Sequence, residues 1–142
     1  MRTGGKLHPA ESVYGWLTVI NGAVGCVMMC ILGATMGFSA TYLGFPLALV
    51  GIVSGVLSLK GKATGFAVAT LFYFVQCVRY YSPIWSIGFT SGFQAGVSIP
   101  LSDGQSIVFN VAAMAGVLYG FGILFNRAWM DNASKDASTS VD

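Results

Sequence analysis

The chain has 142 residues, of which 55% are hydrophobic and 8% are charged, with a formal net charge of +2 and a mean hydropathy of +0.73. About a quarter of the residues of an ordinary soluble domain are charged, so this composition argues against a water-soluble fold and indicates membrane lipid as the surrounding solvent. The charged residues form no basic run, which excludes a nucleic-acid-binding surface.

Four apolar segments are long enough to cross a bilayer, which takes about 17 to 25 helical residues. They cover residues 13–36, 41–59, 63–80 and 106–126. Pro46 falls in the first turn of the second segment, where its missing N–H matters least, and Ser82-Pro83 ends the third. The predicted fold is an all-α membrane protein built as a four-transmembrane-helix bundle.

Small residues four positions apart indicate how these helices pack. Such pairs let helix backbones approach closely in lipid. They are Gly33/Gly37, Gly51/Gly55 and Ala112/Gly116/Gly120. We expect them to pack helices of one chain together, with a dedicated dimerisation face as the alternative.

Positive charges predict the orientation. Six of the seven Lys and Arg residues flank the spans at one end: Arg2, Lys6, Lys60, Lys62, Arg127 and Lys135. Because positively charged loops stay in the cytoplasm, the chain is predicted to be multi-pass with its N- and C-termini cytoplasmic. Arg79 is the exception, and at the outer end of the third span it either snorkels to the headgroups or meets Asp103.

The sequence also predicts a state for the C-terminal tail and for the first span. Residues 131–142 are rich in Ser, Asp and Ala, which predicts a disordered cytoplasmic tail. A signal sequence ending at Cys26 is the rival interpretation of the first span. The apolar run continues beyond Cys26 to Leu32, which favours a span over a cleaved segment.

Residues 85–102 differ from the rest because apolar residues alternate with small or polar ones. A period of two is typical of strands, and the segment exceeds the usual strand length of about 3 to 10 residues. The sequence therefore predicts a small extracytoplasmic β-hairpin between helices 3 and 4, turning at Ser91-Gly92 or Ala95-Gly96. A re-entrant or interfacial segment is the alternative.

The outer hairpin is the predicted working surface. An isolated hairpin is marginal in water, so it must pack on the bundle or on a partner. The residues expected to contact a protein partner at the extracytoplasmic face are Trp85, Phe89, Phe93 and Gln94. The leading hypothesis is a non-enzymatic integral membrane protein that acts as an accessory or interaction subunit.

Polar residues near the outer ends of the spans provide a second hypothesis. Gln76, Arg79, Asp103 and Asn110 would line a polar vestibule in a small oligomeric channel or transporter. Hydrogen bonds from helix to helix are the simpler interpretation of these side chains. No Asp, Glu or His lies within a predicted span, which argues against proton-coupled transport. A homo-oligomer is compatible with either hypothesis.

The chain offers little for catalysis or for a cofactor. Cys26, Met29 and Cys30 share a helical face and suit Cu(I), but one helix supplies only these three ligands. His8 lies outside the spans, and no Ser or Cys has a base close in sequence. The sequence therefore predicts no enzymatic activity, no metal and no cofactor.

Overall fold

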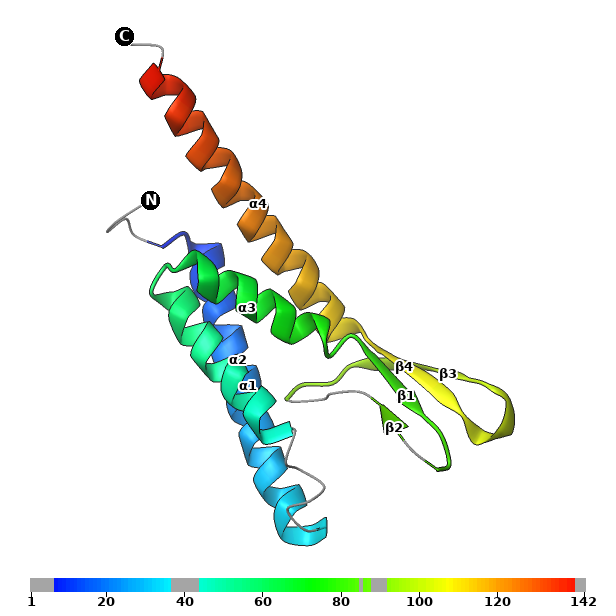
Figure 1. The fold of residues 1–142 in the computed structure, drawn as a ribbon. Coiled ribbons are helices and arrows are strands. Elements are labelled where there is room, and N and C mark those ends of the chain that lie inside the picture. Colours follow the sequence, from blue (N-terminus) through cyan, green and yellow to red (C-terminus); the bar gives the residue numbers. More distant parts are fainter. Residues whose placement is uncertain (1–6, 37–43, 85, 88–91, 140–142) are drawn as a thin grey trace.

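The computed structural model describes residues 7–36, 44–84, 86–87 and 92–139. Within these ranges, four helices form, and a four-stranded sheet lies between the third and fourth of them along the sequence (Figure 1). The elements in chain order are α1 (Pro9–Met36), α2 (Gly44–Leu59), α3 (Ala63–Phe74), β1 (Val78–Tyr81), β2 (Ser86–Ile87), β3 (Gly96–Pro100), the short 3₁₀ turn η2 (Ser102–Gly104), β4 (Ser106–Asn110) and α4 (Val111–Thr139).

Helices α1 and α2 lie side by side with their backbones in close contact (Figure 1). A Cβ atom on Gly22 would lie 2.7 Å from the carbonyl oxygen of Ala48, and one on Gly55 would lie 2.7 Å from the backbone nitrogen of Val19. Neither neighbour is a flexible side chain, so only glycine fits at these two positions. Close approach of this kind gains dispersion contacts without a hydrophobic driving force.

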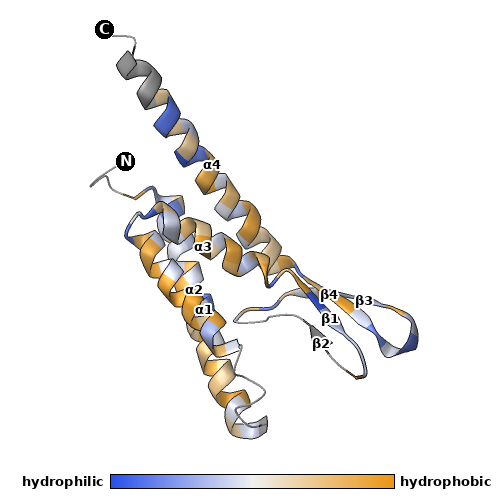
Figure 2. Cartoon of the chain, in the orientation of Figure 1, coloured by the Kyte–Doolittle hydropathy of each residue, from blue (hydrophilic) through white to orange (hydrophobic). Residues whose placement is uncertain are grey.

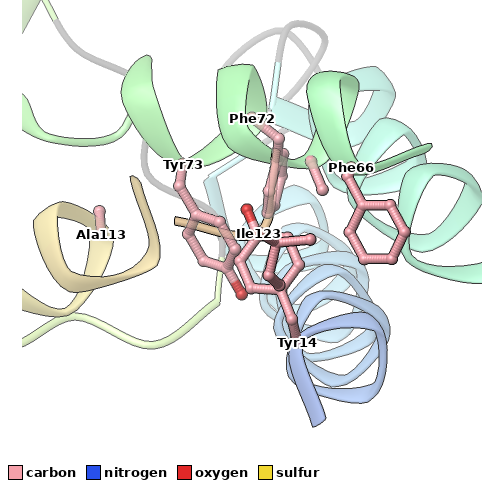
Figure 3. Packing of buried hydrophobic residues seen from close by; sticks show 7 residues of the cluster. Tyr14, Phe66, Phe72, Tyr73, Ala113 and Ile123 are labelled. Atoms are coloured by element: carbon pink, nitrogen blue, oxygen red, sulfur yellow. The ribbon is translucent and has the colours of Figure 1, made fainter. Parts of the chain in front are cut away.

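Helices α3 and α4 pack on the first half of α1 through an aromatic cluster (Figure 3). The Tyr14 ring centre lies 6.2 Å from that of Phe66 and 5.9 Å from that of Tyr73. A Cβ atom on Gly116 of α4 would lie 2.7 Å from the Tyr73 ring, and one on Gly120 would collide with Thr70. The expected packing of small residues between helices of one chain is thus confirmed for α4.

Two of the described helices are long and apolar enough to cross a membrane, over Pro9–Thr35 and Val111–Ala133. The other two are apolar, as Figure 2 shows, but have only 16 and 12 residues. At 1.5 Å per residue, α2 and α3 measure about 24 and 18 Å, against a hydrocarbon core of about 30 Å. The described helices therefore support two candidate spans, where the sequence predicted four.

The sheet is antiparallel, with strand order β2-β1-β4-β3. Its two central strands continue the helices, because β1 follows α3 after three residues and β4 leads directly into α4. The register places Val78 and Val97 on either side of Phe109. Figure 1 shows the sheet extending from the C-terminal end of α3 and the N-terminal end of α4, away from the two chain termini.

The sheet corrects two predicted helix boundaries and one predicted strand pairing. The helix predicted over 63–80 ends at Phe74, and the one predicted over 106–126 begins at Val111. The hairpin predicted within 85–102 is also wrong in its pairing, because β3 pairs with β4. The strands β1 and β4 are rich in β-branched and aromatic residues, which favour a pleated conformation over a helix.

The predicted disordered tail is wrong for most of its length. Helix α4 continues through Thr139, so residues 131–139 are helical, and residues 140–142 lie outside the described residues. Extending an existing helix adds one backbone hydrogen bond for each residue fixed, without a new nucleation step. A polar sequence can therefore stay helical when a long apolar helix precedes it.

Replacing Gly22 with Ala should separate α1 from α2, because the new methyl group meets backbone atoms that cannot move independently. We expect Gly22→Ala to lower the free energy of unfolding by about 1 to 3 kcal/mol, measured by denaturation in detergent. Gly122→Ala on α4 is the matched control, since a Cβ there meets no atom within 4 Å. Equal stability of Gly22→Ala and the parent chain would contradict the close contact.

Candidate functional site

A pocket of about 400 Å³ lies between α1, α3 and α4, and Phe93 contributes to its lining. Its volume is within the range of small-molecule sites, about 300 to 1,000 Å³. Val13 and Leu17 of α1 and Tyr119 of α4 line it and are exposed, so the pocket opens sideways between these two helices. Its lining is mainly apolar, with the amide of Gln76 among the exceptions.

Asn21 fixes the chain around Phe93 against the middle of α1. Its side-chain Oδ1 accepts a hydrogen bond from the Phe93 N–H at 2.7 Å, and Gly92 beside it has a positive φ of 85°. Asn21 is buried and 13th in a helix of 28 residues. The segment before β3 therefore contacts α1 at mid-length, with about 22 Å of helix continuing beyond it at 1.5 Å per residue.

Asn110 joins the same segment to α4. Its Oδ1 caps the helix by accepting the Ala113 N–H at 3.3 Å, and it also accepts the Ala95 N–H at 3.4 Å. Its own backbone N–H donates to the Cys77 carbonyl at 2.8 Å. The side chain is buried, and its Nδ2 has no hydrogen-bond partner among the described residues. One asparagine thus links the end of α3, the start of α4 and the approach to β3.

The four residues predicted to form a polar vestibule occupy different levels of the structure. Gln76 is 2% exposed, and its Nε2 donates to the Phe72 carbonyl at 3.0 Å. It precedes Cys77, whose carbonyl accepts the Asn110 N–H, so Gln76 and Asn110 lie near each other along the backbone.

Arg79 and Asp103 lie further along the sheet. Arg79 is opposite Val108 in the β1–β4 ladder, and its guanidinium carbon is 4.3 Å from the centre of the Tyr81 ring. Asp103 is exposed in the η2 turn with a φ of 60°, between the last paired residue of β3 and the first paired residue of β4. The sheet thus separates Asp103 from the buried amides at the helix ends.

Two of the four residues predicted to contact a partner can be placed. Phe93 is 60% exposed although it borders the pocket, and Gln94 is exposed beside it. Trp85 and Phe89 lie outside the described residues. The exposed ring of Phe93 is therefore the described part of this surface.

The sheet has one apolar and one polar face, because residues directly opposite each other in a ladder share a face. The register puts these residues on the apolar face: Val78, Tyr80, Val97, Ile99, Ile107 and Phe109. Val78, Val97 and Ile99 are 50%, 57% and 49% exposed. A sheet normally buries its apolar face against a second layer, and among the described residues this face stays half-exposed.

Sequence reasoning missed the contribution of β1 and β4 to that face. Both strands adjoin long apolar helices, so their residues were counted into the spans. The available signal was local alternation, with Arg79 between Val78 and Tyr80, and a cluster of β-branched residues before Asn110.

An ion pair closes the opposite end of the helices. Arg127 Nε of α4 lies 2.6 Å from Glu11 Oε1 of α1, and its Nη1 donates to the Gly61 carbonyl at 2.8 Å. The guanidinium also lies 4.4 Å from the Phe66 ring centre. Arg127 therefore ties the start of α1 and the α2–α3 turn to α4, which the sequence analysis did not anticipate.

The groups in the pocket suit binding rather than acid–base chemistry. Amides, phenols and apolar side chains line it. Within the described ranges, no group of three or more His, Cys, Asp or Glu residues is placed to hold a metal ion, and the three cysteines are free thiols. No family model, curated protein or solved structure matches the chain.

Asn21→Ala should release the Phe93 segment from α1 without removing helix contacts. Loss of one hydrogen bond worth about 1 kcal/mol raises the population of the locally open state several-fold. We therefore expect faster hydrogen exchange of the Phe93 amide. Thr35→Ala is the control on the same helix, because the Thr35 hydroxyl donates to the Ile31 and Leu32 carbonyls of α1 itself. Unchanged protection of Phe93 in Asn21→Ala would contradict the placement of this segment.

Proposed function

We propose that the chain is a non-enzymatic integral membrane protein that crosses the bilayer four times and acts as an accessory or interaction subunit. Its sheet is the surface that contacts a partner protein in the same membrane. The helices α1 and α4 support insertion by their length and composition, and large apolar side chains are exposed along all four helices.

The ion pair at one end of the helices supports the orientation. Arg127 brings Glu11 and Gly61 together, so the start of α1, the α2–α3 turn and the second half of α4 lie at one level. Lys60 and Lys62 flank Gly61 in that turn. Positive residues gathered at one end of a helical protein favour the cytoplasmic side, which supports the proposal that both termini are cytoplasmic.

The observation that carries the proposal is the shortness of α3. From the cytoplasmic end, the third crossing covers about 18 Å as a helix and then continues through residues 75–77 into β1. Since a hydrocarbon core measures about 30 Å, the sheet begins at membrane depth in this arrangement. Strands at that depth need protein around them, because lipid cannot pair with their backbone groups.

The apolar face of the sheet fits the chemistry of such a partner. Val97 and Ile99 alternate with Gly96 and Ser98 along β3, so one face presents branched apolar side chains and the other presents small or polar ones. The apolar side chains of a neighbouring membrane protein would cover the first face. That contact supplies a second layer for a face that is half-exposed among the described residues.

A small oligomeric channel is the second candidate, favoured by the buried amides of Gln76 and Asn110 at the helix ends. Asp103 lies at the remote turn of the sheet, so the predicted vestibule would need side chains from further copies. Solute flux through reconstituted liposomes that is lost in Gln76→Leu would favour the channel over the accessory subunit.

The double variant Val97→Thr/Ile99→Thr tests the accessory subunit. Threonine keeps the β-branched shape but puts hydroxyls on the apolar face, so we expect co-purification of the partner from native membranes to fall about tenfold, or about 1.4 kcal/mol. Ser98→Thr, on the opposite face of the same strand, is the matched control and should retain the partner. Equal recovery with both variants would contradict contact through the apolar face.

A further inference from the structure

Strand β3 forms one edge of the sheet, and its backbone groups alternate in direction. In an antiparallel ladder, each residue directs both its N–H and its C=O to the same neighbouring strand, and the next residue directs them to the other side. The Val111 N–H donates to the Ala95 carbonyl at 2.7 Å, and the Leu101 N–H donates to the Gln105 carbonyl at 2.8 Å. The odd-numbered residues of β3 therefore face β4.

The hydrogen bonds between β4 and β1 agree with this assignment. The Asn110 N–H donates to the Cys77 carbonyl, which directs the even-numbered residues of β4 toward β1. Its odd-numbered residues, Ile107 and Phe109, then face Ile99 and Val97 across the β3–β4 ladder. Both ladders thus give the same alternation.

The open edge of β3 consequently carries the backbone groups of Gly96, Ser98 and Pro100. Gly96 and Ser98 each offer an N–H and a C=O, whereas Pro100 offers only a C=O because its ring nitrogen has no hydrogen. In the part of the chain that the structure describes, β4 is the only strand that pairs with β3, whose residues are all exposed. An edge of this kind is a template for another strand.

We propose that this edge pairs with β3 of a second copy of the chain, antiparallel and centred on Ser98. In this register, Ser98 and Ser98 of the partner subunit exchange two hydrogen bonds, and each Gly96 N–H donates to the Pro100 carbonyl opposite. Pro100, which has no backbone N–H, lies opposite the Gly96 carbonyl. Every N–H donor at the edge is therefore paired. The strand is self-complementary over all its residues.

The same register also joins the apolar faces of the two sheets. Val97 lies opposite Ile99 of the partner subunit, and directly opposite residues share a face. The apolar surface is then continuous across the twofold axis, while the two Ser98 side chains meet on the polar face. This pairing rests on the proposed function, because an open edge at membrane depth has no water to satisfy it.

Oxidative cross-linking of Ser98→Cys in native membranes tests the pairing. Hydrogen-bonded residues of antiparallel strands have Cα atoms about 5.5 Å apart, within the range that a disulfide spans. We expect Ser98→Cys to form a covalent dimer and Gly96→Cys alone to stay monomeric. The parent chain, with Cys26, Cys30 and Cys77, measures the background. Co-expressed Gly96→Cys and Pro100→Cys chains should link only to each other.

Three outcomes separate this inference from the proposed function. If Ser98→Cys and the co-expressed pair both stay monomeric while the chain resists alkaline extraction from membranes, the pairing of copies is overturned and membrane insertion stands. If a different protein is cross-linked to Ser98→Cys in place of a second copy, the pairing is likewise overturned. If the chain is extracted as a soluble protein but still links through Ser98→Cys, the pairing stands and the proposed function fails.

Discussion

The need to satisfy the hydrogen bonds of the backbone governs this structure. The helices α1, α2 and α4 pair their backbone groups internally. Helix α3 ends at Phe74, and the chain continues from there into the sheet. The two inner strands are satisfied by their neighbours, and Asn110 caps the helix that follows. Among the described residues, β3 forms one edge of the sheet and leaves backbone groups without a strand to pair with.

A few polar contacts position that edge within an otherwise apolar structure. Asn21 holds the approach to β3 at the middle of α1, and Asn110 holds it to α4. At the other end, Arg127 joins Glu11 to Gly61. Apolar packing is non-directional, whereas each of these contacts requires one geometry, so they determine where the sheet lies relative to the helices.

The sequence predicts the apolar segments and the strand β3 because both depend on local periodicity. It does not separate β1 from α3, since Val78 and Tyr80 extend an apolar run and hydropathy is the same for a helix and a strand. Contacts between distant residues leave no pattern in the local sequence. Examples are the register of β3 with β4 and the hydrogen bond between Asn21 and Phe93, which are 72 residues apart. The cap at Asn110 was recognisable in principle, because Asn before an apolar helix is a common start signal.

Sidedness of two exposed positions tests membrane crossing most directly. Lys62 lies in the α2–α3 turn and Ser102 in the turn between β3 and β4, so the proposed third crossing would separate them. With single cysteines at these positions in sealed native vesicles, an impermeant thiol reagent should label Lys62→Cys only from the cytoplasmic side and Ser102→Cys only from the other. Labelling of both positions from the same side would contradict the account.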